Sequence, residues 1–134
     1  MKIDRKVIHQ MFNGHCAYCG CVLESESGKH MQIDHMEPIQ RNIKSEHRIA
    51  WGTYKPCENP NADNLKNMYP ACPSCNNLKG SLPLESYRTQ VQDTIRQLER
   101  TTGFQRALRF GMVETKQWDG IFYFEKQQKS EPTI

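Results

Sequence analysis

The sequence predicts a small α+β domain, and three observations support this class. A short stretch at residues 31–35 has strand character, and segments with the apolar spacing of α-helices lie before and after it. Two Cys-x-x-Cys pairs, Cys16/Cys19 and Cys72/Cys75, bracket that stretch. A length of 134 residues suits a single domain. We therefore expect one α+β domain whose parts are tied together through four thiols.

Composition narrows the class of protein. Hydrophobic residues make up 37% of the chain, so its core is modest and a bound metal would reinforce it. The net charge of +3 is compatible with nucleic acid and equally with an ordinary solvated surface. No apolar run approaches the roughly 18 residues of a membrane span, and no apolar segment follows the basic N-terminus. We predict reduced cysteines, no membrane span and a cytoplasmic location.

The N-terminal part predicts a helix, a turn and a strand. Residues 3–12 have one apolar helical face with Asp4 as N-cap, and Asn13-Gly14 ends the helix. Residues 31–35 form the strand, which Pro38 keeps short. Residues 40–63 give no regular pattern, and we interpret them as a long functional loop.

The C-terminal half predicts two helices and a hairpin. Pro73 begins a short helix that ends at Gly80, and a longer one spans residues 84–101 with Gly103 as its stop. Further segments are a helical turn at 104–110, a β-hairpin of 112–116 with 120–125, and a frayed tail at 127–134. The single domain over 1–134 thus divides into a core at about 16–80 and an extension at 81–126.

The cysteine spacing predicts a structural zinc site. Two cysteines separated by two residues can aim both sulfurs at one tetrahedral ion, at about 2.3 Å each. Fifty-three positions separate Cys19 from Cys72, more than the roughly 15–20 residues of a simple zinc ribbon, so the pairs would clamp an inserted motif. A redox dithiol and free buried cysteines are the alternatives. Cys21 is a possible competing ligand, whereas Cys57 is interpreted as a loop residue.

A carboxylate and an imidazole are adjacent at Asp34-His35. Neighbouring strand residues point to opposite faces, so both reach one site only where the strand ends or distorts. Asp34 offers a hard oxygen to Mg²⁺, and a neutral His35 can accept a proton near pH 7. Asn64 and Asn76 add amide groups. In isolation an Asp-His pair is an ordinary polar pair, and its surroundings favour a chemical role.

The ordered motifs resemble those of an HNH endonuclease of the zinc-knuckle, phage type. The motifs are Cys16-x-x-Cys19, Ile33-Asp34-His35-x-x-Pro38, Asn64-Leu65 and Cys72-x-x-Cys75-Asn76-x-x-Lys79-Gly80. They cover about half of the chain, and the Phe122-Tyr-Phe-Glu125 ending is also similar to some phage-type members. The combination is specific, although each motif alone is weak.

The resemblance implies a ββα-metal (His-Me finger) core and a set of residue roles. His35 matches the general base, and Asp34 matches the adjacent metal ligand. Asn64 matches the middle asparagine, which ties down the loop and orients the base. Asn76 matches the last motif position, often a histidine, so the motif is H-N-N. An amide oxygen is harder than an imidazole nitrogen, which favours Mg²⁺ or Mn²⁺ as the catalytic ion.

The implied activity is hydrolysis of DNA phosphodiester bonds, by nicking or by double-strand cleavage. Arg41, Lys44 and Lys79 are the predicted DNA contacts, although a solvated charged loop would have the same composition. Double-stranded DNA is the expected partner. Phage DNA-packaging (terminase) proteins are a further expected class of partner. The expected location is the cytoplasm of a phage-infected or bacterial host cell.

Two other classes of function remain open at this stage. A non-catalytic, zinc-stabilised nucleic-acid-binding module would need the four cysteines but not Asp34, His35 or Asn76. A thiol oxidoreductase using Cys16 and Cys19 would exchange disulfides and hold no tight zinc.

Overall fold

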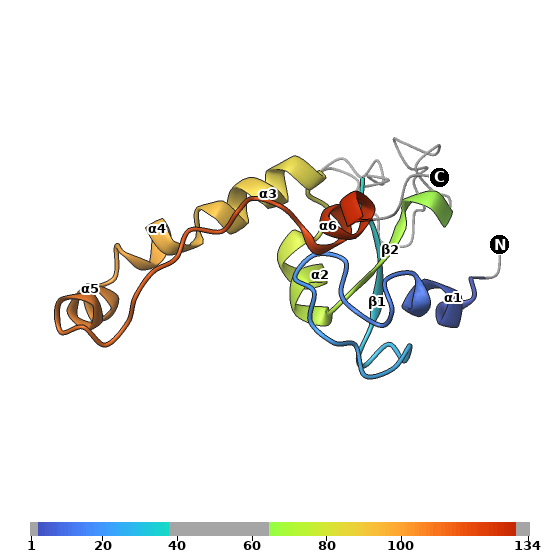
Figure 1. Ribbon diagram of the computed structural model, residues 1–134, viewed down its shortest axis with the longest axis horizontal. Helices are drawn as coiled ribbons and strands as arrows, with labels where there is room; N and C mark the ends of the chain where they lie inside the picture. Colours follow the sequence, from blue (N-terminus) through green and yellow to red (C-terminus); the bar gives the residue numbers. More distant parts are fainter. Residues whose placement is uncertain (1–2, 38–64, 131–134) are drawn as a thin grey trace, which may run out of the picture.

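The computed structural model describes residues 3–37 and 65–130, and the predicted α+β class is confirmed within them (Figure 1). Strands β1 (Gln32–His35) and β2 (Met68–Ala71) form a two-stranded antiparallel sheet. In its register Asp34 lies opposite Tyr69 and His35 opposite Met68. The 3₁₀ turn η3 (Leu65–Asn67) leads directly into β2.

Helix α2 (Pro73–Lys79) follows β2 after one residue and contacts both strands. Cys72 is its N-cap and accepts a hydrogen bond from Cys75 N through Sγ, while Pro73 occupies the first turn, where a missing N–H costs nothing. Gly80 ends the helix with a φ of +51°. The prediction for this helix is confirmed at both ends.

The N-terminal part packs a helix and a loop against the sheet. Helix α1 (Arg5–Gln10) is shorter than the predicted 3–12, and the predicted N-cap is confirmed because Asp4 accepts from Lys6 N. The chain then forms a loop, residues 15–22, closed by a bridge between His15 and Val22. This loop docks on β2, where Ala17 N donates to the Pro70 carbonyl at 2.8 Å.

Aromatic rings fill the core between the loop, the sheet and the C-terminal segment. Tyr18 makes edge contacts to Tyr87, Phe122 and Phe124, and Phe124 also packs edge-on against Tyr69. All five side chains are buried. Burial of this much aromatic surface joins segments that are distant in sequence, so the C-terminal segment is part of the core.

The predicted C-terminal β-hairpin is wrong. Residues 112–122 contain no strand, and helix α6 (Tyr123–Ser130) begins where the second strand was expected. The N–H groups of Tyr123 and Phe124 donate to the carbonyls of Tyr18 and Ala17 in the N-terminal loop. Glu125 accepts from Phe122 N and so caps the helix. Tertiary hydrogen bonds and a helix cap therefore override the β propensity of the aromatic residues. The helix also continues through 127–130, part of the predicted frayed tail.

A helical arm projects from this body (Figure 1). It contains α3 (Leu84–Gln92), α4 (Thr94–Leu98) and α5 (Thr102–Arg109), and residues 110–122 return along it. The single helix predicted at 84–101 is wrong: it breaks at Asp93, whose neighbours Thr94 and Ile95 are β-branched and weak helix formers. Gly103, the predicted stop, lies inside α5.

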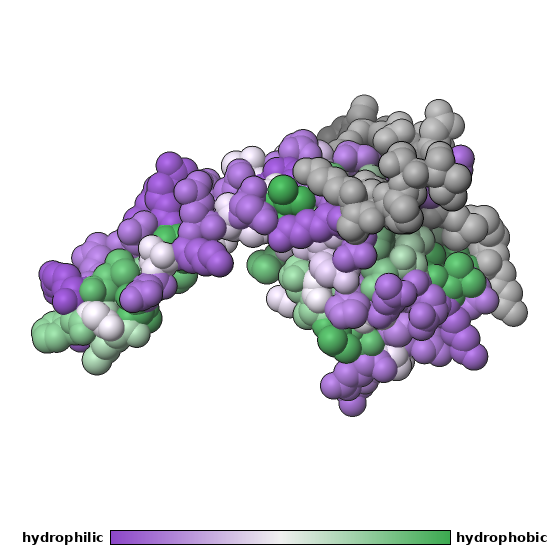
Figure 2. All heavy atoms as spheres, in the orientation of Figure 1, coloured by the Kyte–Doolittle hydropathy of each residue, from purple (hydrophilic) through white to green (hydrophobic). Residues whose placement is uncertain are grey.

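Burial is confined to the root of the arm. Leu84 and Tyr87 are buried, whereas neither α4 nor α5 buries a residue. Figure 2 shows hydrophobic residues at the far end, where Phe110 and Met112 are exposed. None of the helices in the described residues has the length and apolar character that crossing a membrane requires.

We predict that Arg88 fastens the root of the arm to the C-terminal segment. Its guanidinium forms a bidentate pair with Glu125 at 2.6 and 2.7 Å, and it also bonds to Glu85 and to the Gly120 carbonyl. Arg88→Met should lower the free energy of unfolding by about 2–3 kcal/mol, because partly buried charged partners lose their hydrogen bonds. Urea denaturation measures this loss. The control Arg96→Met removes an exposed ion pair with Asp93 and should change stability by less than about 0.5 kcal/mol; equal losses would contradict the assignment.

Candidate metal centre and adjoining polar site

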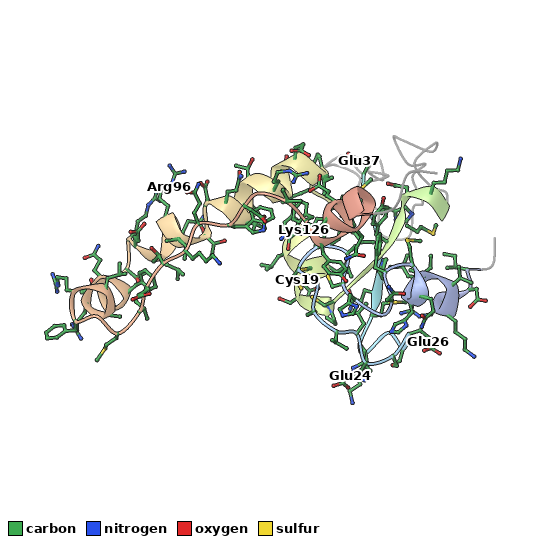
Figure 3. The ribbon with its side chains drawn as sticks, in the orientation of Figure 1. Cys19, Glu24, Glu26, Glu37, Arg96 and Lys126 are labelled. Carbon is green, nitrogen blue, oxygen red and sulfur yellow. The ribbon has the colours of Figure 1, made fainter. Side chains whose placement is uncertain are left out.

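Four cysteine sulfurs converge between the N-terminal loop and the start of α2. The Sγ atoms of Cys16, Cys19, Cys72 and Cys75 all lie within 4.8 Å of one another, and those of Cys19 and Cys72 are 3.9 Å apart. Sulfurs placed about 2.3 Å from a tetrahedral ion would be about 3.8 Å apart. The cluster is therefore compatible with a structural zinc site. Figure 3 labels Cys19 on the loop that faces α2.

The local fold explains why these sulfurs converge. Gly20 turns the loop with a φ of +82°, and a Cβ there would lie 2.7 Å from the Tyr123 ring. The N–H of Tyr18 points at Cys16 Sγ at 3.4 Å, and that of Cys75 points at Cys72 Sγ at 3.3 Å. Such bonds stabilise negative charge on sulfur, which suits thiolate ligands.

The clustered thiols change one another's pKa. Hydrogen bonds from Cys19 and Cys75 lower the pKa of the Cys16 thiol far below its usual value. The hydrogen bond to Cys16 raises the pKa of Cys75, and the bond to Cys16 also raises that of Cys19. Four thiolates this close repel one another, so full deprotonation requires a bound cation.

Cys21 and Cys57 are the two remaining cysteines of the chain. Cys21 is exposed and is not one of the four clustered sulfurs, and desolvation raises the pKa of its thiol. Interactions with the thiols of Cys19 and Cys72 raise that pKa further, so Cys21 lies beside the cluster without being one of its four sulfurs. Cys57 lies outside the described residues.

A buried ion pair lies on the side of β1 that faces α2. Asp34 is 5% exposed, and its Oδ2 accepts from Tyr18 Oη at 2.5 Å and pairs with Lys79 Nζ at 3.0 Å. Burial, with the Asp34 charge adding to it, raises the pKa of the Tyr18 hydroxyl, so this group stays a donor. The predicted metal ligand Asp34 is thus already engaged by a cation of the protein itself.

The other predicted residues of the site lie along the same strand and helix. Asn76 donates from Nδ2 to Gln32 Oε1, and Lys79 donates to the His35 carbonyl at 3.1 Å. Gln32 and Asp34 are two positions apart, so they face the same side of β1. Asn76 and Asp34 are consequently on one side of the sheet. His35 is the last residue of β1 and is half-buried.

Asn67 also belongs to this region, although no sequence motif pointed to it. Asn67 is buried, and its amide accepts from Glu37 N at 2.9 Å and donates to the Glu37 carbonyl at 2.7 Å. Its own carbonyl accepts from Met36 N. Asn67 therefore ties the end of β1 to the start of β2. Asn64, which was expected to tie down the loop and orient the base, lies outside the described residues. The partners of this amide are backbone groups, which every residue has, so the sequence contains no pattern that marks Asn67.

The predicted DNA contacts have different outcomes. Arg41 and Lys44 lie outside the described residues. The side chain of Lys79 is fully buried in its pair with Asp34, which differs from the surface position that a phosphate contact requires.

An apolar cavity borders the cysteine cluster and not His35. Its volume is about 420 Å³, and its lining includes Cys19, Leu78, Tyr87 and Trp118. Asp34, His35 and Asn76 are absent from that lining. The apolar cavity and the polar groups of β1 are therefore separate features.

We predict that Asn67→Ala releases the segment after β1. The N–H groups of Met36 and Glu37 should exchange at least tenfold faster with solvent, because a buried amide that bonds to backbone contributes about 1–3 kcal/mol. Amide exchange followed by NMR measures the effect. Asn77→Ala, at an exposed position of α2, is the matched control and should leave both rates unchanged.

We also predict one zinc ion per chain, bound by the four clustered cysteines. Cys75→Ser should abolish stoichiometric zinc, whereas Cys21→Ser should retain it. Metal analysis of the purified variants measures this difference. A chelator should unfold the wild-type domain, because the metal supplies folding free energy. Full zinc content in Cys75→Ser would rule out the ligand set.

Comparisons with known proteins add no identification: no family model, curated protein or solved structure matches the chain. The function is therefore argued from the residues and their geometry.

Proposed function

We propose that the chain is a metal-dependent HNH endonuclease that hydrolyses DNA phosphodiester bonds. One observation carries most of the support: α2 lies across β1 with Asn76 against Gln32 and Lys79 against Asp34 and His35. Two antiparallel strands followed by such a helix are the arrangement that the motif resemblance implies. The clustered cysteines fasten that helix to the N-terminal loop.

In this proposal His35 is the general base, taking a proton from the water that attacks the phosphorus. Positioned general bases contribute typically about 10²–10⁴-fold to the rate. The carbonyl of His35 accepts from Lys79, and the N–H of the next residue, Met36, donates to the Asn67 carbonyl. These two bonds hold the main chain of His35 at the end of β1. A general base benefits from such a rigid support because proton transfer depends on geometry.

Asp34 and Asn76 are the proposed holders of one Mg²⁺ or Mn²⁺ ion. The side-chain contacts of Asp34 with Tyr18 and Lys79 both use Oδ2, and the side chain of Asn76 bonds through Nδ2. Within the described residues, Oδ1 of Asp34 and Oδ1 of Asn76 therefore have no partner. Both are hard oxygens, which suit these ions. When bound, the ion would neutralise charge on the phosphate and on the leaving 3′-oxygen.

The substrate in this proposal is double-stranded DNA, with Arg41 and Lys44 as phosphate contacts. Asn64 remains a proposed support for the base, and Asn67 joins it on the strength of its contacts. DNA-packaging (terminase) proteins of a phage are the proposed partner class, and the cytoplasm of a bacterial host is the proposed location.

One observation favours a second candidate, a non-catalytic zinc module that binds nucleic acid. Lys79 already neutralises Asp34, so a divalent ion must share that carboxylate with an ammonium. A module of this kind would keep the cysteines and bind DNA, but no metal ion would make it cleave.

We predict that His35→Ala abolishes cleavage of supercoiled plasmid in Mg²⁺ or Mn²⁺, because the base is lost, while zinc content and DNA affinity remain. Gel-based nicking assays with and without EDTA measure activity, and fluorescence anisotropy measures binding. His30→Ala removes a loop histidine that faces Glu24 and should cleave at the wild-type rate.

Either of two results would contradict the nuclease proposal. Wild-type cleavage by His35→Ala would remove the base assignment. A wild-type protein that binds DNA but nicks no plasmid with any divalent ion would favour the non-catalytic module.

A further inference from the structure

Lys79 is an unusual residue in this fold because its long cationic side chain is completely buried. It is the last residue of α2 and is among the largest side chains with almost no exposed surface. Lysine is rarely buried, because a buried ammonium loses its hydrogen bonds to water and needs protein groups to replace them. The partners of Lys79 therefore indicate what the protein gains from its burial.

Those partners are two consecutive residues of β1 and one ring. Nζ lies 3.0 Å from Asp34 Oδ2 and donates to the His35 carbonyl at 3.1 Å. The Tyr18 ring centroid is 5.9 Å away, and the Tyr18 hydroxyl bonds to the same Asp34 oxygen. A lysine ammonium has three donors, and two of them are used on adjacent residues of one strand.

The bond to the His35 carbonyl acts together with a second restraint on the next peptide. Lys79 holds the carbonyl of His35, and the Asn67 carbonyl accepts from the N–H of Met36 in the same peptide unit. His35 is also paired with Met68 of the neighbouring strand β2. The peptide that leaves His35 is thus fixed at both its oxygen and its nitrogen, which limits rotation of the backbone at this residue.

We infer that Lys79 is a positioning residue for His35, and not a phosphate contact. The inference rests on the proposed nuclease function for what His35 does. Lys79 connects the end of α2 to the peptide of the proposed base, and the same ammonium pairs with the carboxylate of the preceding residue, Asp34. A buried side chain with these partners cannot reach a phosphate without breaking the pair.

The test compares Lys79→Met with Lys79→Arg and with Lys29→Met, a control at an exposed loop position. Lys79→Met keeps the aliphatic length but loses the donors, so the maximal cleavage rate should fall at least about 100-fold, as misplaced catalytic groups do. Its DNA affinity and the salt dependence of that affinity should equal those of the wild type. Lys79→Arg retains donors and charge and should recover part of the rate. Lys29→Met should match the wild type throughout.

Two results from these variants would overturn the inference. Wild-type cleavage by Lys79→Met would show that the base needs no such support. A weaker DNA affinity with a salt slope reduced by about one would identify Lys79 as a phosphate contact.

NMR of the wild-type protein tests the contact without any variant, which matters if Lys79→Met does not fold. A buried, hydrogen-bonded ammonium exchanges its protons slowly, so the Lys79 NH₃⁺ signal should persist at a pH where that of Lys29 has disappeared. Equally fast exchange at both lysines would overturn the inference. If the wild type does not cleave DNA, the proposed function fails together with the role of Lys79 in it, and a persistent Lys79 signal then identifies a purely structural contact.

Discussion

The convergence of four cysteine sulfurs between the N-terminal loop and α2 is the constraint on which the rest of this structure depends. Within the described residues the sheet has two strands of four residues each, and isolated pairs of this size are marginal in water. α2 contains seven residues, which is too short for independent stability. These elements therefore need a cross-link, and the cysteine cluster joins the loop at Cys16 and Cys19 to the first turn of α2.

A second layer of contacts passes this restraint on to β1. The Lys79–Asp34 ion pair and the Asn76–Gln32 hydrogen bond lie three residues apart on α2 and two residues apart on β1. Buried ion pairs are weak evidence for stability because desolvation offsets their attraction. Their geometry, however, allows one register of helix on strand, since a shift would leave an ammonium and a carboxylate buried without partners. The register matters because the proposed base and ion ligands lie on these two elements.

How far the sequence predicted this structure depended on how local each signal was. The N-cap at Asp4, the proline at the start of α2 and the glycine at its end are local signals, and each was confirmed. The aromatic run near the C-terminus has high β propensity, yet Phe122 and Phe124 pack against Tyr18, over 100 positions away. That environment is absent from any local window. The break at Asp93, by contrast, coincides with weak local helix formers at Thr94 and Ile95, which the apolar spacing of residues 84–98 concealed.

The candidate site shows the same difference between local signals and long-range contacts. Cys-x-x-Cys spacing alone predicted the cluster, because two residues between cysteines set the geometry of their sulfurs. The engagement of Lys79 with Asp34 and of Asn67 with Glu37 could not be predicted, since each contact crosses at least 30 positions and lysine normally lies on the surface.

Hydrogen exchange of the zinc-loaded and the chelated protein, compared peptide by peptide, tests most directly whether one metal-bound cross-link organises the site. We expect β1, β2 and α2 to lose protection together when zinc is removed, whereas α5, which buries no residue, should change little. Retained protection in β1 and β2 after complete removal of zinc would contradict it, because the sheet would then be stable without the cysteine cluster.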